Sequence, residues 1–253
     1  MTLRPYWLLL ALSLCFSLSA VAVDAPALLP DGAAAVLPDA EQVRQQEQLL
    51  AIIDMSGLTG LGIQARHVAQ QILNDTNAPL GQQYDVVDRI APVWAPEQLQ
   101  QRLSALLQGY DEAQRQQLLS TLNSRVILQA RSKEQSAVQQ QDSPAYQDYI
   151  ARLRQQQPAA ERLRMIQELD TAMLFSGFLI QTRAAVYPEL QAVLRSWKPS
   201  ENWQDTVRRD ALEFLLYTYR STPNHELQKL ASAWREPLLQ DWLQAVRQQL
   251  GKS

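Results

Sequence analysis

Apolar residues recur along most of the chain at the three- and four-residue spacing of one face of an α-helix. The stretch between Leu99 and Leu107 is the clearest case, with leucines at its first, fifth, eighth and ninth positions. This spacing places the side chains on one side of a helix, where they can pack against a core. No stretch shows the sustained alternation of apolar and polar residues that is typical of a half-buried strand. The sequence therefore predicts an all-α fold built as a multi-helix domain.

Capping residues, prolines and glycines divide this pattern into separate helices. Asp39 and Thr59 are placed to cap the first two, and Asp111 with Gln114 three residues later has the spacing of a capping box. Pro237 should kink the last helix, because its ring meets the carbonyl one turn back. The expected helices span residues 40–56, 60–74, 82–90, 96–107, 112–141, 144–157, 158–173, 203–219 and 223–250.

Two short stretches carry more specific expectations. The helix over residues 82–90 should bury Val86, Val87 and Ile90, and Pro92 should stop it. Residues 172–180 are the most apolar stretch after the N-terminus, yet they are too few to span a bilayer. We expect them to form a helix that is buried on several sides.

The first residues have the pattern of a secretory signal peptide. Arg4 supplies a positive charge, residues 7–18 form an apolar run, and residues 20–22 form the small-x-small site that signal peptidase cuts. The run is shorter than the roughly 20 residues that a membrane-spanning helix needs. We therefore expect residues 1–22 to be cleaved near Ala22. The protein would then be exported to the periplasm, with no transmembrane segment in the mature chain.

Cys15, the one cysteine of the chain, lies inside this N-terminal peptide. The residue before it is Leu14, where a lipoprotein signal needs a small residue, so a passive place in the apolar run is favoured over lipidation. Cleavage removes Cys15, and the mature chain can then form no disulfide or thiolate metal site. Its stability must come from its core.

The remainder of the chain is expected to contain two helical units. They follow a leader rich in Ala, Pro and Asp that has no sustained period and is expected to be flexible. The expected divisions are the leader at 23–38, a first unit at 39–141, a connecting helix at 142–157 and a second unit at 158–253.

Short matches between the two units indicate a duplication. Residues 63–66 and 180–183 both read Ile-Gln-x-Arg, and Tyr110 and Tyr219 each precede a turn and a further helix. Matching leucines are common in helical proteins, so coincidence of amphipathic patterns is the alternative. We interpret the matches as two duplicated four-helix units.

The C-terminal part resembles a known family. Residues 214–219 read Phe-Leu-Leu-Tyr-Thr-Tyr, and residues 234–237 read Trp-Arg-Glu-Pro. Together with the N-terminal peptide and the helix ending at residues 56–58, these motifs resemble an uncharacterised proteobacterial family of periplasmic helical proteins with a domain of unknown function. The chain departs from the family's aromatic-x-Ser-Pro-x-Gly pattern at Glu236 and Leu239. The resemblance implies a periplasmic helical protein and brings no catalytic residues.

Few residues of the mature chain have the chemistry of a catalytic or metal site. His67 and His225 have no second ligand at metal-binding spacing. Residues 56–62 are glycine-rich but lack the Lys-Ser/Thr pair of a phosphate-binding loop, so we expect a helix-to-helix turn with close packing. A net charge of −3 gives no indication of nucleic-acid binding. We therefore expect no metal, no cofactor and no recognisable catalytic constellation.

Carboxylates are the remaining candidates for chemistry. The first unit contains Asp54 and Arg66, and the second contains Asp170 and Arg183 at corresponding places. We expect these four to form structural ion pairs, which favour one arrangement of the chain. The alternative is a carboxylate-based envelope hydrolase, in which Glu168 and Asp170 would belong to an acid pair.

Aromatic residues near the C-terminus are candidates for partner binding. Side chains of this kind supply much of the energy of protein contacts, although plain core packing is the alternative. We therefore expect a non-enzymatic binding or interaction module of the cell envelope, whose partner is an unknown protein, peptide or lipid in the periplasm. The candidate anchors are Trp203, Tyr217, Tyr219, Trp234 and Trp242.

Overall fold

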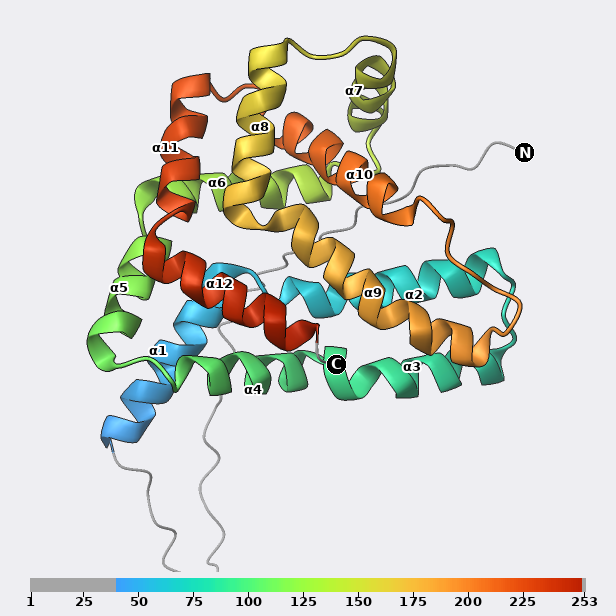
Figure 1. Ribbon diagram of the computed structural model, residues 1–253, viewed down its shortest axis with the longest axis horizontal. Helices are drawn as coiled ribbons and strands as arrows, with labels where there is room; N and C mark the ends of the chain where they lie inside the picture. Colours follow the sequence, from blue (N-terminus) through green and yellow to red (C-terminus); the bar gives the residue numbers. More distant parts are fainter. Residues whose placement is uncertain (1–39, 252–253) are drawn as a thin grey trace, which may run out of the picture.

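The protein is described by a computed structural model of residues 40–251, and every regular element in this part of the chain is an α-helix. The all-α prediction is therefore confirmed. The predicted signal peptide (1–22) and leader (23–38) lie outside the described residues. The helices, labelled in Figure 1, are α1 (Ala40–Ser56), α2 (Gly60–Asp75), α3 (Leu80–Trp94), α4 (Pro96–Leu107), α5 (Glu112–Leu122), α6 (Arg125–Gln139), α7 (Pro144–Gln155), α8 (Ala160–Met173), α9 (Phe175–Val193), α10 (Trp203–Thr218), α11 (Asn224–Trp234) and α12 (Pro237–Leu250).

The start of α5 shows how local sequence places a helix boundary. The backbone N–H of Gln114 donates to the Asp111 carboxylate at 2.8 Å, and the backbone N–H of Asp111 donates to the Gln114 side-chain oxygen at 2.9 Å. The predicted capping box is therefore confirmed. Thr59 precedes α2 as expected, but its side chain makes no capping hydrogen bond.

Two predicted long helices are each divided in the structure. The one expected over 112–141 breaks between α5 and α6, where Ser124 is extended. The one expected over 223–250 breaks between α11 and α12, and Pro237 opens α12. A proline in the first turn costs no backbone hydrogen bond, because that N–H has no acceptor within the helix. The predicted kink was therefore wrong, and Pro237 starts a new helix.

Two further boundaries differ from the expectation. Helix α3 continues through Pro92 to Trp94, whose indole is buried, so packing at its end offsets the lost hydrogen bond. The apolar stretch 172–180 is not one helix, because Leu174 adopts a left-handed conformation with φ of 52° and separates α8 from α9. This turn lets α9 leave α8 at an angle and pack on α2, α3 and α10 (Figure 1).

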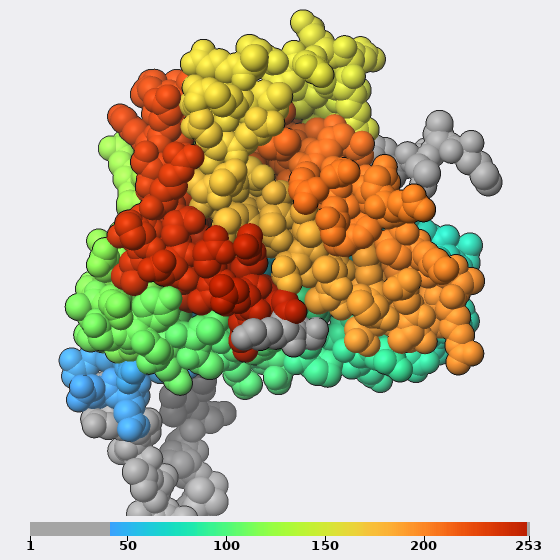
Figure 2. Space-filling model, in the orientation of Figure 1, coloured from blue at the N-terminus to red at the C-terminus, as the bar shows by residue number. Residues whose placement is uncertain are grey.

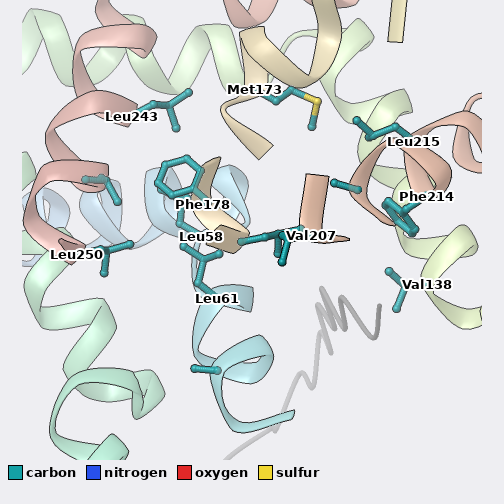
Figure 3. Packing of buried hydrophobic residues seen from close by; sticks show 14 of the residues in the cluster. Leu58, Leu61, Val138, Met173, Phe178, Val207, Phe214, Leu215, Leu243 and Leu250 are labelled. Atoms are coloured by element: carbon teal, nitrogen blue, oxygen red, sulfur yellow. The ribbon is translucent and has the colours of Figure 1, made fainter. Parts of the chain in front are cut away.

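One hydrophobic core joins the N-terminal and C-terminal parts. Figure 3 shows Leu58 and Leu61 of the N-terminal part in the same buried cluster as Phe178 of α9 and Val207 of α10. Helix α12 closes this core by packing on α4, α5 and α9. The helices of the two predicted units therefore depend on each other for burial. None of the helices in the described part of the chain is long and apolar enough to cross a bilayer.

The packing of the two units follows a common order. Helix α1 packs on α4 and α5, and α8 packs on α10 and α11. Helix α6 packs on α10 and α11 of the other unit, and α12 reciprocally packs on α4 and α5. Helix α3, between α2 and α4, has no counterpart in the second unit, because residues 194–202 between α9 and α10 contain no helix. Duplication of the two units stays a prediction. Each predicted unit contains more than four helices, α1–α6 in the first and α8–α12 in the second. The buried stripes of α2 and α9 also match in spacing: Leu61, Ala65, Ala69 and Leu73, and Phe178, Thr182, Val186 and Leu190.

Candidate functional site

The aromatic residues predicted as partner anchors belong mostly to the core. Tyr217, Tyr219, Trp234 and Trp242 are all buried. Trp203 is half-buried, with its ring edge-on to that of Tyr187. These side chains therefore contribute to packing, which was the alternative that the sequence left open.

Tyr219 takes part in a buried hydrogen bond. Its hydroxyl donates to Glu134 of α6 at 2.6 Å, and both side chains are buried. Burial raises the pKa of Glu134, while the hydrogen bond from Tyr219 and the charge of Arg131 lower it in part. Arg162 donates to the carbonyl oxygens of Tyr219 and Thr222 and so holds the turn before α11. These contacts support a structural role for this group of residues.

Glu134 should make the stability of the protein depend on pH. Because its folded pKa is raised, the folded state binds a proton more strongly than the unfolded state, and the free energy of unfolding contributed by this group rises as pH falls through the folded pKa. Glu134→Gln keeps an acceptor for Tyr219 and cannot ionise. We expect the variant to be the more stable protein at about pH 8 and its advantage to shrink towards about pH 5.

Urea unfolding across this pH range measures the difference. Glu201→Gln, at an exposed position before α10, is the control and should follow the wild-type curve. A constant difference between Glu134→Gln and wild type at all pH values would contradict the assignment of the pH dependence to Glu134.

The four residues predicted as ion pairs lie in different surroundings. Both carboxylate oxygens of Asp170 accept hydrogen bonds from Ser176, one from the backbone N–H at 2.8 Å and one from the hydroxyl at 2.7 Å. The charged neighbour of Asp54 is Arg131, which also donates to the Asp54 carbonyl. The structure thus gives both acids partners that sequence spacing did not indicate. The chain turns at Leu174 between α8 and α9, and this turn brings Ser176 to Asp170. Asp170 therefore holds the start of α9 against the end of α8.

The two arginines predicted to form ion pairs differ in their exposure to solvent. Arg66 is exposed on α2, whereas Arg183 is buried on α9. Burial raises the pKa of Tyr187. The charge of the neighbouring Arg183 and a hydrogen bond from it lower this pKa in part. Burial raises the pKa of Asp210 on α10, and the charge of Arg183 is one of those that lower it in part. Arg183 therefore belongs to the packing between α9 and α10.

A carboxylate pair that the sequence reasoning missed lies on α10. Asp210 and Glu213 are one turn apart and both are buried. Glu213 accepts two hydrogen bonds from Arg154 of α7, from Nε at 3.0 Å and Nη2 at 2.8 Å. Burial raises the pKa of Asp210. The bidentate arginine ties Glu213 to α7, which indicates a role in fixing the two helices. Among the described residues, no group of three or more His, Cys, Asp or Glu side chains could hold a metal ion.

Helix α3 exposes apolar side chains along one face. Leu80 is 68 % exposed, Tyr84 69 % and Val87 45 %. Val86 and Ile90 are buried as predicted, but the expected burial of Val87 was wrong, because a rotation of 100° per residue carries it away from Val86. We call Leu80, Tyr84 and Val87 the α3 stripe. Its signal in the sequence was the spacing of four and then three residues, which gives α3 a second apolar face.

Val87, at the end of the α3 stripe, lines a groove between α2 and α3. The groove has a volume of about 350 Å³. His67 of α2 lies in its wall, half-buried, with a pKa that burial and the charge of Arg183 both lower although Asp142 raises it. Helix α3 itself forms the edge of the molecule below α9, as Figure 2 shows. The groove is lined by Ile63, Arg66, His67, Ala69, Gln70 and Leu73 of α2 and by Val87 and Ile90 of α3.

No family model, curated protein or solved structure matches this chain. The motifs behind the family resemblance, residues 214–219 and 234–237, lie at the end of α10 and at the turn between α11 and α12. Tyr219 and Trp234 within them are buried, so packing accounts for these residues. A function for this protein therefore rests on its own surface chemistry.

Proposed function

We propose that this protein is exported to the periplasm and acts there as a non-enzymatic interaction module of the cell envelope. The pattern of residues 1–22 supports export. The observation that carries the interaction function is the α3 stripe beside the groove between α2 and α3. Contiguous exposed apolar side chains next to a groove are typical of binding surfaces in soluble domains.

The energetics of the α3 stripe favour a bound partner. Full burial of a side chain such as leucine or valine is worth about 1.5–3 kcal/mol relative to exposure. Leu80 and Tyr84 are more than two thirds exposed, so most of this free energy is left for an interaction. Helix α3 also lies outside the packing order that the two units have in common. An additional helix that leaves an apolar face uncovered is consistent with a binding function.

The hydrolase alternative receives little support from the carboxylates that suggested it. Asp170 binds Ser176 through both oxygens, and Glu168 forms a salt bridge with Arg164 one turn before it on α8. Both acids therefore already have partners that explain their positions.

Photocrosslinking at the α3 stripe tests the proposed function. A photoreactive benzoylphenylalanine replaces Tyr84 in intact producing cells, and a second protein carries it at Leu128, which is 42 % exposed on α6. We expect a covalent adduct with another polypeptide from position 84, recovered in the periplasmic fraction. Position 128 serves as the control and should give none. Equal yields at both positions, or no polypeptide adduct at position 84, would count against an interaction surface on α3.

A further inference from the structure

We propose that the end of the molecule around α7 and the turn between α10 and α11 is a docking surface for an anionic phospholipid membrane. The surface carries Lys133, Arg152, Arg162 and Arg220, which we call the cationic patch. Figure 1 shows α7 and the starts of α8 and α11 at one end of the molecule, with α3 and α4 at the opposite end. The patch is therefore separate from the α3 stripe, and the inference goes beyond the function proposed for that stripe.

Hydrogen bonds to the turn between α10 and α11 bring three of these cations together. Lys133 of α6 donates to the hydroxyl of Thr222 at 2.7 Å, and Arg162 of α8 donates to the Thr222 carbonyl oxygen, also at 2.7 Å. Arg220 donates to the carbonyl oxygen of Tyr217 at 2.8 Å and lies over the ring of that tyrosine, 3.9 Å from its centroid. The three cationic groups therefore lie around the same turn.

Tyr149 of α7 connects Arg152 to the other cations. Its hydroxyl donates to the carbonyl oxygen of Leu216, close before the turn, at 3.1 Å. Burial raises the pKa of Tyr149, and the charges of Arg162, Arg220 and Arg152 lower it in part. All three guanidinium groups therefore lie close enough to act on one hydroxyl.

The cationic patch has no carboxylate partner in the described part of the chain. None of the salt bridges among residues 40–251 includes any of its four side chains. Glu213 accepts two hydrogen bonds from Arg154 and is neutralised by it. The exposed acids of the same region, Asp148, Glu161 and Glu226, form none of these salt bridges either. The donors of the patch therefore remain available to an anion.

The chemistry of the patch fits phosphate groups on an extended surface. A guanidinium group matches phosphate oxygens because it presents several N–H donors in one plane. The four cations come from α6, α7, α8 and the turn before α11, which spreads them over one end of the molecule. An anionic bilayer presents repeated phosphates over such an area and attracts basic side chains that approach it.

A protein partner fits the patch less well. Protein interfaces are usually centred on aromatic or other large side chains that lose their water on binding. Within residues 40–251, α7, α8 and the turn between α10 and α11 expose no large apolar side chain. Leu128 is exposed on α6, but it lies five residues before Lys133 and is turned about 140° away from it around the helix. Attraction to a membrane surface needs no such anchor.

Co-sedimentation of the purified protein with vesicles tests the inference. Vesicles of phosphatidylcholine alone are neutral, and vesicles that also contain phosphatidylglycerol are anionic. We expect binding to the anionic vesicles only, and weaker binding as sodium chloride is raised, because salt screens the attraction. Arg152→Gln combined with Arg220→Gln removes two charges of the patch. This double variant should bind about 25-fold more weakly, since each basic side chain near an anionic surface contributes about fivefold.

Arg66→Gln combined with Arg195→Gln is the matched control. Both arginines are exposed, on α2 and after α9, and neither forms a salt bridge among the described residues. Their loss changes the net charge by the same amount, so the control should bind as the wild type does. Circular dichroism checks that both double variants fold. Equal losses in the two would assign the binding to net charge and overturn the patch.

Other results would also overturn a lipid surface. Equal binding to neutral and anionic vesicles would assign the contact to an apolar segment. Inorganic phosphate that released the protein more effectively than chloride at equal ionic strength would indicate a site for a single anion. Binding to soluble polyglutamate and to neither kind of vesicle would indicate an acidic polypeptide, and no binding at all would leave the patch without an occupant. In each case crosslinking at the α3 stripe would still decide the proposed function.

Discussion

Replacing Trp242 with alanine is expected to lower the free energy of unfolding by about 3–5 kcal/mol. The side chain is fully buried on α12, the helix that closes the core against α4, α5 and α9. Alanine would leave a cavity that these helices can fill only in part. Since a domain is typically stable by about 5–15 kcal/mol, this loss is a large share of the total. Urea unfolding followed by circular dichroism measures it.

Trp242→Phe is the matched control for this prediction. Phenylalanine keeps most of the apolar volume and removes the indole N–H, which is buried and has no hydrogen-bond partner among residues 40–251. We expect it to cost clearly less than alanine. If both variants lost the same free energy, the cavity would not be the cause. If neither variant lowered the free energy of unfolding, the assignment of Trp242 to the buried core under α12 would be wrong.

Replacing Gly62 with alanine is expected to cost about 1–3 kcal/mol. A Cβ atom at this position of α2 would lie 2.5 Å from the backbone carbonyl oxygen of Trp94, at the end of α3. A backbone oxygen cannot rotate away as a side chain can, so α2 and the junction between α3 and α4 would have to move apart. The midpoint of urea unfolding should fall.

Gly81→Ala gives the matched comparison for Gly62→Ala. Gly81 lies in α3, and an added Cβ would meet no atom of the described part of the chain within 4 Å. Alanine is favoured over glycine within a helix by about 0.5–1 kcal/mol, so this variant should be slightly more stable than wild type. If Gly62→Ala were as stable as Gly81→Ala, helix propensity, and not the close approach to Trp94, would govern position 62.

Gly62 also shows which local features the sequence predicted correctly. The glycine-rich residues 56–62 were expected to form a close helix-to-helix turn, and Gly57 indeed has a φ of 75° while Gly62 contacts the end of α3. The capping box at Asp111 was likewise confirmed. The turn at Gly57 and the capping box at Asp111 depend on residues adjacent in the chain, so the local sequence contains their physical cause.

The helix boundaries predicted incorrectly depended on distant contacts. The periodicity over 112–141 is continuous, yet the chain turns at Ser124 so that α5 packs on α1 and α6 on α10 and α11. Pro92 was read as a stop, but burial of Trp94 extends α3 past it. Periodicity reports which side of a helix is apolar and does not report which neighbour will cover it.

The candidate site illustrates the same limit. Aromatic residues were chosen as anchors for their chemistry, and Tyr217, Tyr219, Trp234 and Trp242 are buried. Leu80 and Tyr84 were not among the predicted anchors, and Leu80 lies before the helix that the sequence predicts over 82–90. Their importance depends on whether another helix covers them, which follows from the packing of α2, α3 and α9.

The sequence by itself determined the helical class of the chain, the capping box that begins α5 and the apolar faces of helices such as α4, because these follow from spacing and from hydrogen bonds within one turn. Only the tertiary structure decided where the helices turn and which apolar residues remain uncovered. Burial of a side chain depends on the helices that pack against it, and these come from residues far away in the chain. The α3 stripe is exposed for that reason, since α2 and α9 cover only one side of α3.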